Sequence, residues 1–254
     1  MAKIKARKAG EVRRNIRKSL KAVRCSAKPD TVHDLRTGLR RCEALSSQPL
    51  PKPVKKLRKQ AGRVRDCDVL LRLLDDLDLA KAESAANAHG LNKLRNAISK
   101  QRENYARELV SMAAKVSLAK LKKWSRKHVI QPDRGIDGVL SDFHRIVDDS
   151  DYCNLGEHNL HDFRLEIKPL RYRAETFKQP QAESIARRLN AMQSAIGDWH
   201  DLVLLADFAE RVLGEDDSVA VMIHSEVENS YRDCLHTALQ QKKALARTKL
   251  RLAK

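Results

Sequence analysis

The chain has 254 residues, of which 42% are apolar and 33% charged, so it is long enough to bury a core and is not intrinsically disordered. No stretch approaches 18 uncharged apolar residues, and the basic N-terminus leads into no apolar segment, so neither a membrane span nor a signal peptide is expected. The net charge is +18, and residues 1–72 alone hold 22 Lys and Arg against 6 Asp and Glu, a balance of +16. Such a concentrated basic field favours polyanionic partners.

Helix is predicted almost throughout, because Gly, Pro and aromatic residues are few and strand-like alternation is nearly absent. The helices expected in the first half cover about residues 3–24, 31–45, 54–77 and 85–124, the last being one helix or two. Asp30 or Thr31 is the expected N-cap of the second helix, and Gly62 is expected to interrupt or bend the third. Residues 126–136 are the predicted central linker.

The second half is predicted to repeat this order. Its helices are expected at about residues 136–147, 157–177 and 181–211, followed by a last long helix that starts after the loop 213–218. A polar loop is expected between the first two. Pro169 lies inside the second of these helices, where it removes one backbone hydrogen bond and is expected to kink the helix.

A histidine motif occurs twice in the chain. The first copy is His33-Asp34-Leu35-Arg36 followed by Arg40, and the second is His161-Asp162-Phe163-Arg164 followed by Lys168. Helical positions i, i+3 and i+7 share one face, so each copy presents a stripe of one histidine and two cations. The opposite faces are apolar and are expected to anchor the helices, through Leu35, Leu39 and Cys42 in one copy and Phe163, Ile167, Leu170 and Phe177 in the other.

A second motif also occurs twice, downstream of each histidine motif. Gly62, three residues, Asp66 and an apolar run correspond to Gly197, three residues, Asp201 and an apolar run. The histidine motifs lie 128 residues apart and the glycine motifs 135. Two ordered motifs at near-equal offsets indicate a duplicated helical bundle, with repeat 1 at about residues 1–127 and repeat 2 at about 128–254.

With both motif pairs, the chain resembles the CHAD family, the conserved histidine α-helical domain. The first copy also has the Arg65-Asp66-x-Asp68-Val69-Leu70 form typical of that family. The resemblance covers nearly the whole chain and implies a single all-α domain of two pseudo-symmetric antiparallel helical bundles with a basic central groove. It implies a stand-alone member that binds inorganic polyphosphate without enzymatic activity. The departures from the pattern are Pro169 and the His200-Asp201 pair, where the family has Arg-Asp.

Polyphosphate carries about one negative charge per internal phosphate, so a binder needs many closely spaced cations, and arginine presents a fork that fits phosphate oxygens. Arg65 and Asp66 are expected to form a structural ion pair or helix-turn element rather than a catalytic site. Each histidine either donates to phosphate or bonds a neighbouring helix. Lys52, Lys55, Lys59 and Arg63 share one side of their helix, as a second basic wall or as a solvated face. The predicted polyphosphate-binding residues are His33, Arg36, Arg40, Arg41, Lys55, Lys59, Arg63, His161, Arg164, Lys168 and Arg171.

Two other functions remain as alternatives. Nonspecific nucleic-acid binding rests on the same electrostatics, although the chain lacks zinc-ligand spacing and a Gly-rich RNA motif and has few aromatics for base stacking. A metal-dependent phosphohydrolase is suggested by the two His-Asp dipeptides, but the cations on the same face would oppose a divalent metal. No catalytic residue, metal or cofactor is therefore expected. The five scattered cysteines predict reduced thiols and a cytoplasmic protein, and association with polyphosphate granules is a further expectation.

Overall fold

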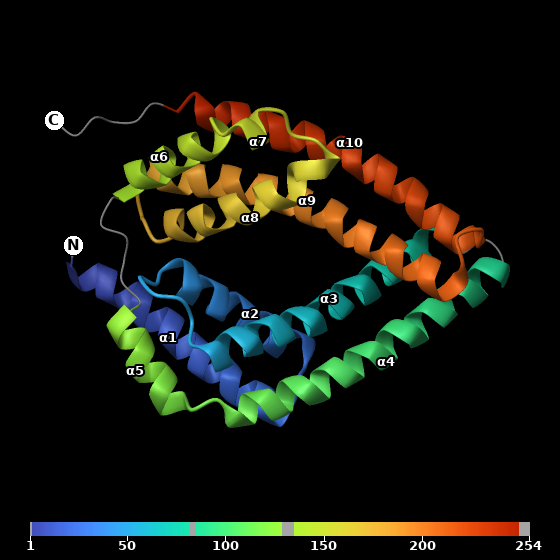
Figure 1. The fold of residues 1–254 in the computed structure, drawn as a ribbon, viewed down its shortest axis with the longest axis horizontal. Helices are drawn as coiled ribbons and strands as arrows, with labels where there is room; N and C mark the ends of the chain where they lie inside the picture. The colour runs from blue at the N-terminus through green and yellow to red at the C-terminus, as the bar shows by residue number, and fades with distance from the viewer. Residues whose placement is uncertain (1, 82–84, 129–134, 249–254) are drawn as a thin grey trace. The chain divides into compact units, whose positions relative to one another are not determined.

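The structure is a computed structural model that describes residues 2–81, 85–128 and 135–248, and every regular element in those ranges is a helix (Figure 1). The all-α fold class is therefore confirmed. The helices are α1 (Ala2–Cys25), α2 (Pro29–Ala44), α3 (Lys52–Lys81), α4 (Ala85–Lys115), α5 (Leu118–His128), α6 (Gly135–Val147), α7 (Ser150–Cys153), α8 (Glu157–Ala174), α9 (Pro180–Leu213) and α10 (Ser218–Ala246).

The structure corrects several local predictions. The helix α3 continues through Gly62, because the glycine faces a neighbouring side chain rather than ending the helix. The N-cap of α2 is Lys28, which forms no side-chain capping bond; Pro29 begins the helix with its φ preset for it. The segment predicted as a polar loop before α8 contains the short helix α7. The helix α8 ends at Ala174 rather than near residue 177; it contains Pro169, and the kink expected there stays a prediction.

The chain divides into two compact units. Unit 1 comprises Met1–Gln131 and Leu204–Ile223, and unit 2 comprises Pro132–Val203 and His224–Lys254. Most of the predicted linker, residues 129–134, lies outside the described ranges, while α5 continues to His128 and α6 starts at Gly135. The duplication and the boundaries of its repeats stay predictions.

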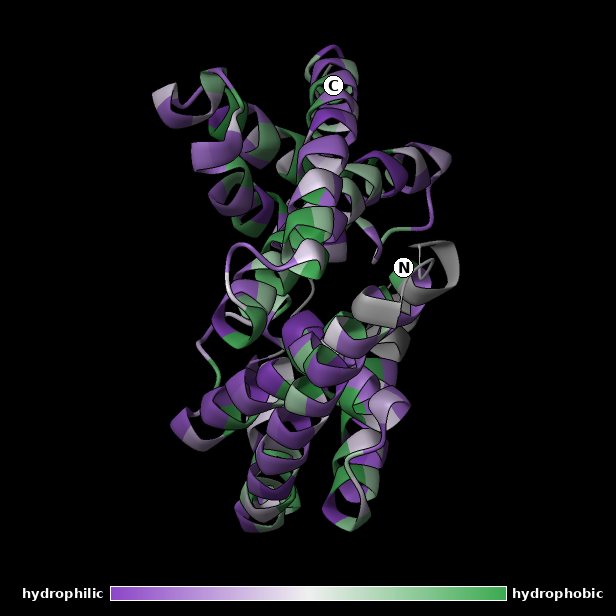
Figure 2. Ribbon diagram, turned by 90° about the vertical axis from the view of Figure 1, so that its right-hand side faces the viewer, coloured by the Kyte–Doolittle hydropathy of each residue, from purple (hydrophilic) through white to green (hydrophobic). Residues whose placement is uncertain are grey.

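In unit 1 the helix α2 packs between α1 and α3, and α3 lies beside α4 (Figure 1). The apolar side chains of α1, α2, α3, α4 and α5 form one buried cluster. Arg24 links α1 to the end of α4 by two hydrogen bonds. Its Nε donates to the carbonyl oxygen of Ala113 at 3.0 Å, and its Nη2 donates to that of Val116. Figure 2 shows hydrophilic and hydrophobic residues side by side along the helices, as expected when each helix buries only one face.

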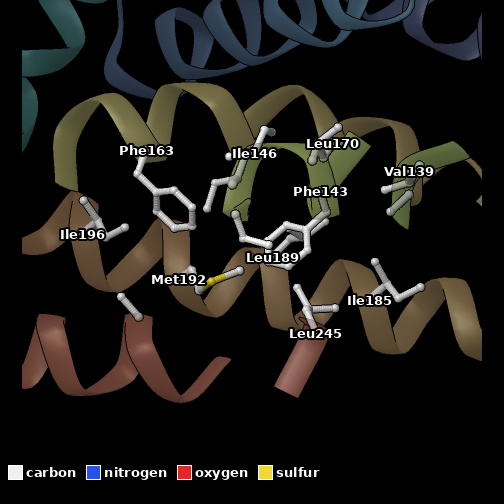
Figure 3. Close-up of a cluster of buried hydrophobic side chains, with 14 of the residues drawn as sticks. Val139, Phe143, Ile146, Phe163, Leu170, Ile185, Leu189, Met192, Ile196 and Leu245 are labelled. Atoms are coloured by element: carbon white, nitrogen blue, oxygen red, sulfur yellow. The ribbon is translucent and has the colours of Figure 1, made fainter. Parts of the chain in front are cut away.

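In unit 2 the helices α6, α8, α9 and α10 enclose a second buried cluster. Figure 3 shows the Phe163 ring of α8 beside Ile196 and Met192 of α9. Asn159 fixes the start of α8: its Nδ2 donates to the carbonyl oxygens of Asp151 and Asn154, and its Oδ1 accepts from the backbone N–H of Gly156 at 2.9 Å. The second motif therefore lies on a helix whose first turn is tied to α7.

Candidate anion-binding motif sites

The first histidine motif lies on α2, whose inner face is fully buried. Leu35, Leu39 and Cys42 are all 0% exposed, as predicted. On the side towards α1, Gly38 lies so close to Ile16 that a Cβ at position 38 would be 2.9 Å from the Ile16 Cγ1. This close packing holds α2 in place, so the side chains on its other faces project from a rigid support.

Arg36 lies across the neighbouring helix α3. A Cβ at Gly62 would be 3.7 Å from its Nε, and its Nη2 is 3.7 Å from Oδ1 of Asp66. The Arg36 Nε is buried and forms no hydrogen bond with the described residues. The two sequence motifs thus meet here: the arginine of the first motif packs over the glycine and beside the aspartate of the second.

His33 completes this site on the same side of α2. Burial, and then the positive charge of Arg65 on α3, lower its pKa below the ordinary value for histidine, with Arg36 adding to the effect. The free protein therefore favours a neutral imidazole here. We call His33, Arg36, Arg40, Gly62, Arg65 and Asp66 the first motif site.

The second histidine motif lies on α8 and is anchored in the same way. Phe163 and Ile167 are 0% exposed and Leu170 is buried. Arg164 reaches α9, where its Nε donates to the carbonyl oxygen of Gln193 at 3.0 Å. A Cβ at Gly197 would lie 2.7 Å from its Nη2 and 3.2 Å from both Cζ and Nε. Only glycine leaves room for the guanidinium in this position.

His161 and His200 face each other in this site. Their ring centroids are 4.3 Å apart, with the rings inclined by 49°. Burial, and then the charge of Arg164, lower the pKa of His161, whose Nδ1 is buried without a hydrogen bond to a described residue. His200 follows Gly197 by three residues, as Arg65 follows Gly62. We call His161, Arg164, Lys168, Gly197 and His200 the second motif site.

The other predicted cations are not all in the two motif sites. Arg41 lines a cavity between α1 and α2, beside Asn15 and Thr37, on the side of α2 that faces α1. In unit 2, Arg171 donates to Oδ1 of Asn190, forms an ion pair with Glu175 at 3.5 Å and lies over the ring of Tyr172. The contacts of Arg171 therefore lie within its own unit.

The predicted basic wall of α3 divides in a similar way. Lys55 and Lys59 are exposed and share a helical stripe with Gly62 and Asp66, at positions i, i+4, i+7 and i+11. Arg63 instead lies towards α4, with its guanidinium 5.6 Å from the ring centroid of Tyr105. The two lysines therefore extend the stripe of the first motif site, whereas Arg63 does not.

Sequence reasoning missed the role of the glycines. It used Gly62 and Gly197 as signs of duplication, but the structure places each against the arginine of a histidine motif. It also grouped Asp66 with Arg65 as an ion pair or helix-turn element, and did not foresee Arg36, whose Nη2 lies 3.7 Å from the Asp66 Oδ1. The signal was present in the sequence, because the histidine and glycine motifs recur together in the same order.

The described part of the chain contains neither a metal-binding cluster nor a membrane-spanning helix. Within those residues, no group of three or more His, Cys, Asp and Glu side chains is arranged to hold a metal ion. None of the described helices is long and apolar enough to cross a membrane.

Comparison with known proteins identifies what the chain is similar to. A model of the CHAD domain family matches residues 8–210. The structure is similar to that of the CHAD domain from the plant Ricinus communis, with a TM-score of 0.66 and 18% identity, over 96% of this chain and 91% of that one. It is also similar to PptA from Streptomyces chartreusis, with a TM-score of 0.68 and 16% identity, over 92% and 97% of the two chains. No curated protein matches the sequence.

Proposed function

The chain belongs to the CHAD domain family, and from this premise we propose that it binds inorganic polyphosphate without catalysing a reaction on it. The observation that carries the proposal is the recurrence of one arrangement in both units: a buried helix face, and opposite it a motif arginine laid over a glycine of the next helix, beside a histidine. This arrangement holds cations in fixed positions, as a repetitive anion requires.

The chemistry of the two motif sites suits phosphate. Guanidinium groups donate in a planar fork that matches two phosphate oxygens, and the helices that carry them are anchored by their buried faces. Arg36 has a buried Nε that donates to no described residue, and its partner Asp66 is 3.7 Å away, a loose ion pair that a phosphate can replace. Release of counterions from the polyanion adds to the affinity.

The proposal predicts a marked preference for polyphosphate over duplex DNA. We would titrate the chain with long polyphosphate, tripolyphosphate and DNA in parallel, at one near-physiological salt concentration. The variant Arg36→Ala/Arg40→Ala should weaken polyphosphate binding strongly. The matched control is Lys93→Ala/Lys100→Ala, which removes two charges from exposed positions of α4. Equal losses in the two variants would show that total charge, rather than the motif, binds the anion.

Chain length tests the predicted groove. If the cations of both motif sites act on one ligand, each added phosphate adds contacts until the sites are filled, so affinity should rise steeply with length. Equal affinity for tripolyphosphate and a long chain would instead indicate a single small-anion pocket. Tighter binding of DNA than of long polyphosphate would favour the nucleic-acid alternative, and release of phosphate in the presence of Mg²⁺ or Mn²⁺ would favour the hydrolase.

A further inference from the structure

A second group of cations surrounds a cavity of about 240 Å³ between α1 and α5, within unit 1. The cations come from one stripe of each of the two helices. One stripe of α1 contributes Arg13, Arg14 and Arg17, and one stripe of α5 contributes Lys122 and Arg126. Neither histidine motif lies on these two helices, so this cavity is separate from the first motif site.

The floor of the cavity is apolar. Ile16 is 2% exposed and Leu121 is 6% exposed, and both belong to the buried cluster of unit 1, which Leu118 packs against. An apolar interior with a few converging polar groups is typical of pockets for small molecules. The volume is slightly below the usual range of about 300–1,000 Å³, so the ligand should be smaller than a drug-sized molecule.

Among the described residues, no carboxylate forms an ion pair with the five cations at the rim. None of the described lining residues is Asp or Glu. Five like charges gathered at one cavity repel each other, and a bound anion would relieve that repulsion. The rim therefore selects for negative charge, and arginine forks in particular suit phosphate.

We propose that this cavity binds a small phosphate monoester that carries a compact apolar group. The phosphate lies among the cations of the rim, and the apolar group lies on the floor formed by Ile16, Leu118 and Leu121. Inorganic polyphosphate, the ligand proposed for the motif sites, has no apolar part and leaves this floor uncovered. The inference does not depend on the proposed polyphosphate function, because it uses other residues and another ligand class.

Phenyl phosphate is a suitable probe, with inorganic phosphate as its counterpart that lacks the apolar group. Titration calorimetry on the full chain at about 0.15 M salt should give an affinity for phenyl phosphate about tenfold higher than for inorganic phosphate, because the ring leaves water. Equal affinities for the two would overturn the proposal, because the apolar floor would then contribute nothing.

Two variants locate the binding. Arg17→Ala/Arg126→Ala changes two exposed residues and should lower the affinity for phenyl phosphate at least tenfold. The control Lys93→Ala/Lys100→Ala removes the same charge from exposed positions of α4 and should leave the affinity for phenyl phosphate nearly unchanged. Leu118→Phe fills the cavity from its half-buried wall and should also abolish binding of the ring. The assignment would be overturned if Arg17→Ala/Arg126→Ala and Lys93→Ala/Lys100→Ala lowered the affinity for phenyl phosphate equally. It would also be overturned if Leu118→Phe kept the full affinity.

Discussion

The two motif sites have the same plan but differ in how tightly they hold their arginine. In the first, Arg36 has an unbonded Nε, an aspartate at 3.7 Å and ordinary van der Waals room above Gly62. In the second, Arg164 donates to the Gln193 carbonyl and occupies the space that a Cβ at Gly197 would need. A fixed cation at Arg65 in the first corresponds to the titratable His200 in the second. The same motif therefore holds its arginine in two ways. Arg36 is loosely paired with a carboxylate, whereas Arg164 is hydrogen-bonded to the backbone of the next helix.

The largest expected effect comes from removing the cations of each site in turn. Arg36→Ala/Arg40→Ala should lower the affinity for long polyphosphate at least about a hundredfold, since it removes two charged hydrogen bonds worth roughly 1.5–3 kcal/mol each. Arg164→Ala/Lys168→Ala should lower it only about tenfold, because Arg164 already donates within the protein. Calorimetric titration of both variants measures this difference. A greater loss in the second variant would reverse the ranking of the two sites.

The starts of α2 and α8 differ as well, and substitutions there should change the free energy of unfolding by different amounts. Asn159 is buried and makes three side-chain hydrogen bonds at the start of α8, so Asn159→Ala should destabilise unit 2 by about 2–3 kcal/mol. The helix α2 starts without a side-chain cap, and Thr31→Ala should cost under about 0.5 kcal/mol. Urea unfolding with hydrogen exchange of α2 and α8 amides would measure both. Similar costs would mean that the Asn159 bonds contribute little.

Substituting Gly62 and Gly197 should change the polyphosphate affinity by smaller amounts that still differ between the two sites. Gly197→Ala should displace the Arg164 guanidinium and break its bond to Gln193, lowering polyphosphate affinity several-fold. Stability should change by less than about 1 kcal/mol, because the gain in helix propensity offsets the lost bond. Gly62→Ala has room for its Cβ and should leave affinity unchanged.

Binding measured next to thermal unfolding separates the two effects of these glycine substitutions. If Gly62→Ala weakened binding as much as Gly197→Ala, the close contact of Arg164 with Gly197 would not explain the effect of substituting that glycine.

The smallest expected effect concerns pH. The pKa of His33 and that of His161 are lowered in the free protein, chiefly by burial. A bound polyanion favours the protonated imidazole, so binding should take up protons, and affinity should rise a few-fold as the pH falls from about 8 to 6. His200→Arg supplies a fixed charge and should raise affinity at pH 8 and flatten this dependence. Calorimetry in buffers of different ionisation enthalpy measures the proton uptake, and proton release on binding would contradict the assignment.

Much of the fold follows from local sequence. The apolar faces predicted for the motif helices are the buried ones, with Leu35, Leu39, Phe163 and Ile167 all 0% exposed, because helical periodicity alone sets which residues share a face. The predicted helix at residues 3–24 matches α1 within one residue at each end. Two local signals were misleading. Gly62 does not interrupt α3, because helix propensity is a weak preference that packing of the whole helix overrides. Asp30 is not the N-cap, because Pro29 begins α2 without a capping side chain.

The sequence by itself determined the helical class, the two cationic motifs and the faces they occupy, since these depend on residue type and on a period of 3.6. Only the tertiary structure decided which cations act together. It placed Arg36 over Gly62 and Arg164 over Gly197, turned Arg41 towards α1 and Arg63 towards Tyr105, and assembled the cavity between α1 and α5. Helical spacing cannot supply this information, because it fixes directions around one axis, whereas contact between helices depends on which faces pack and how closely their backbones approach.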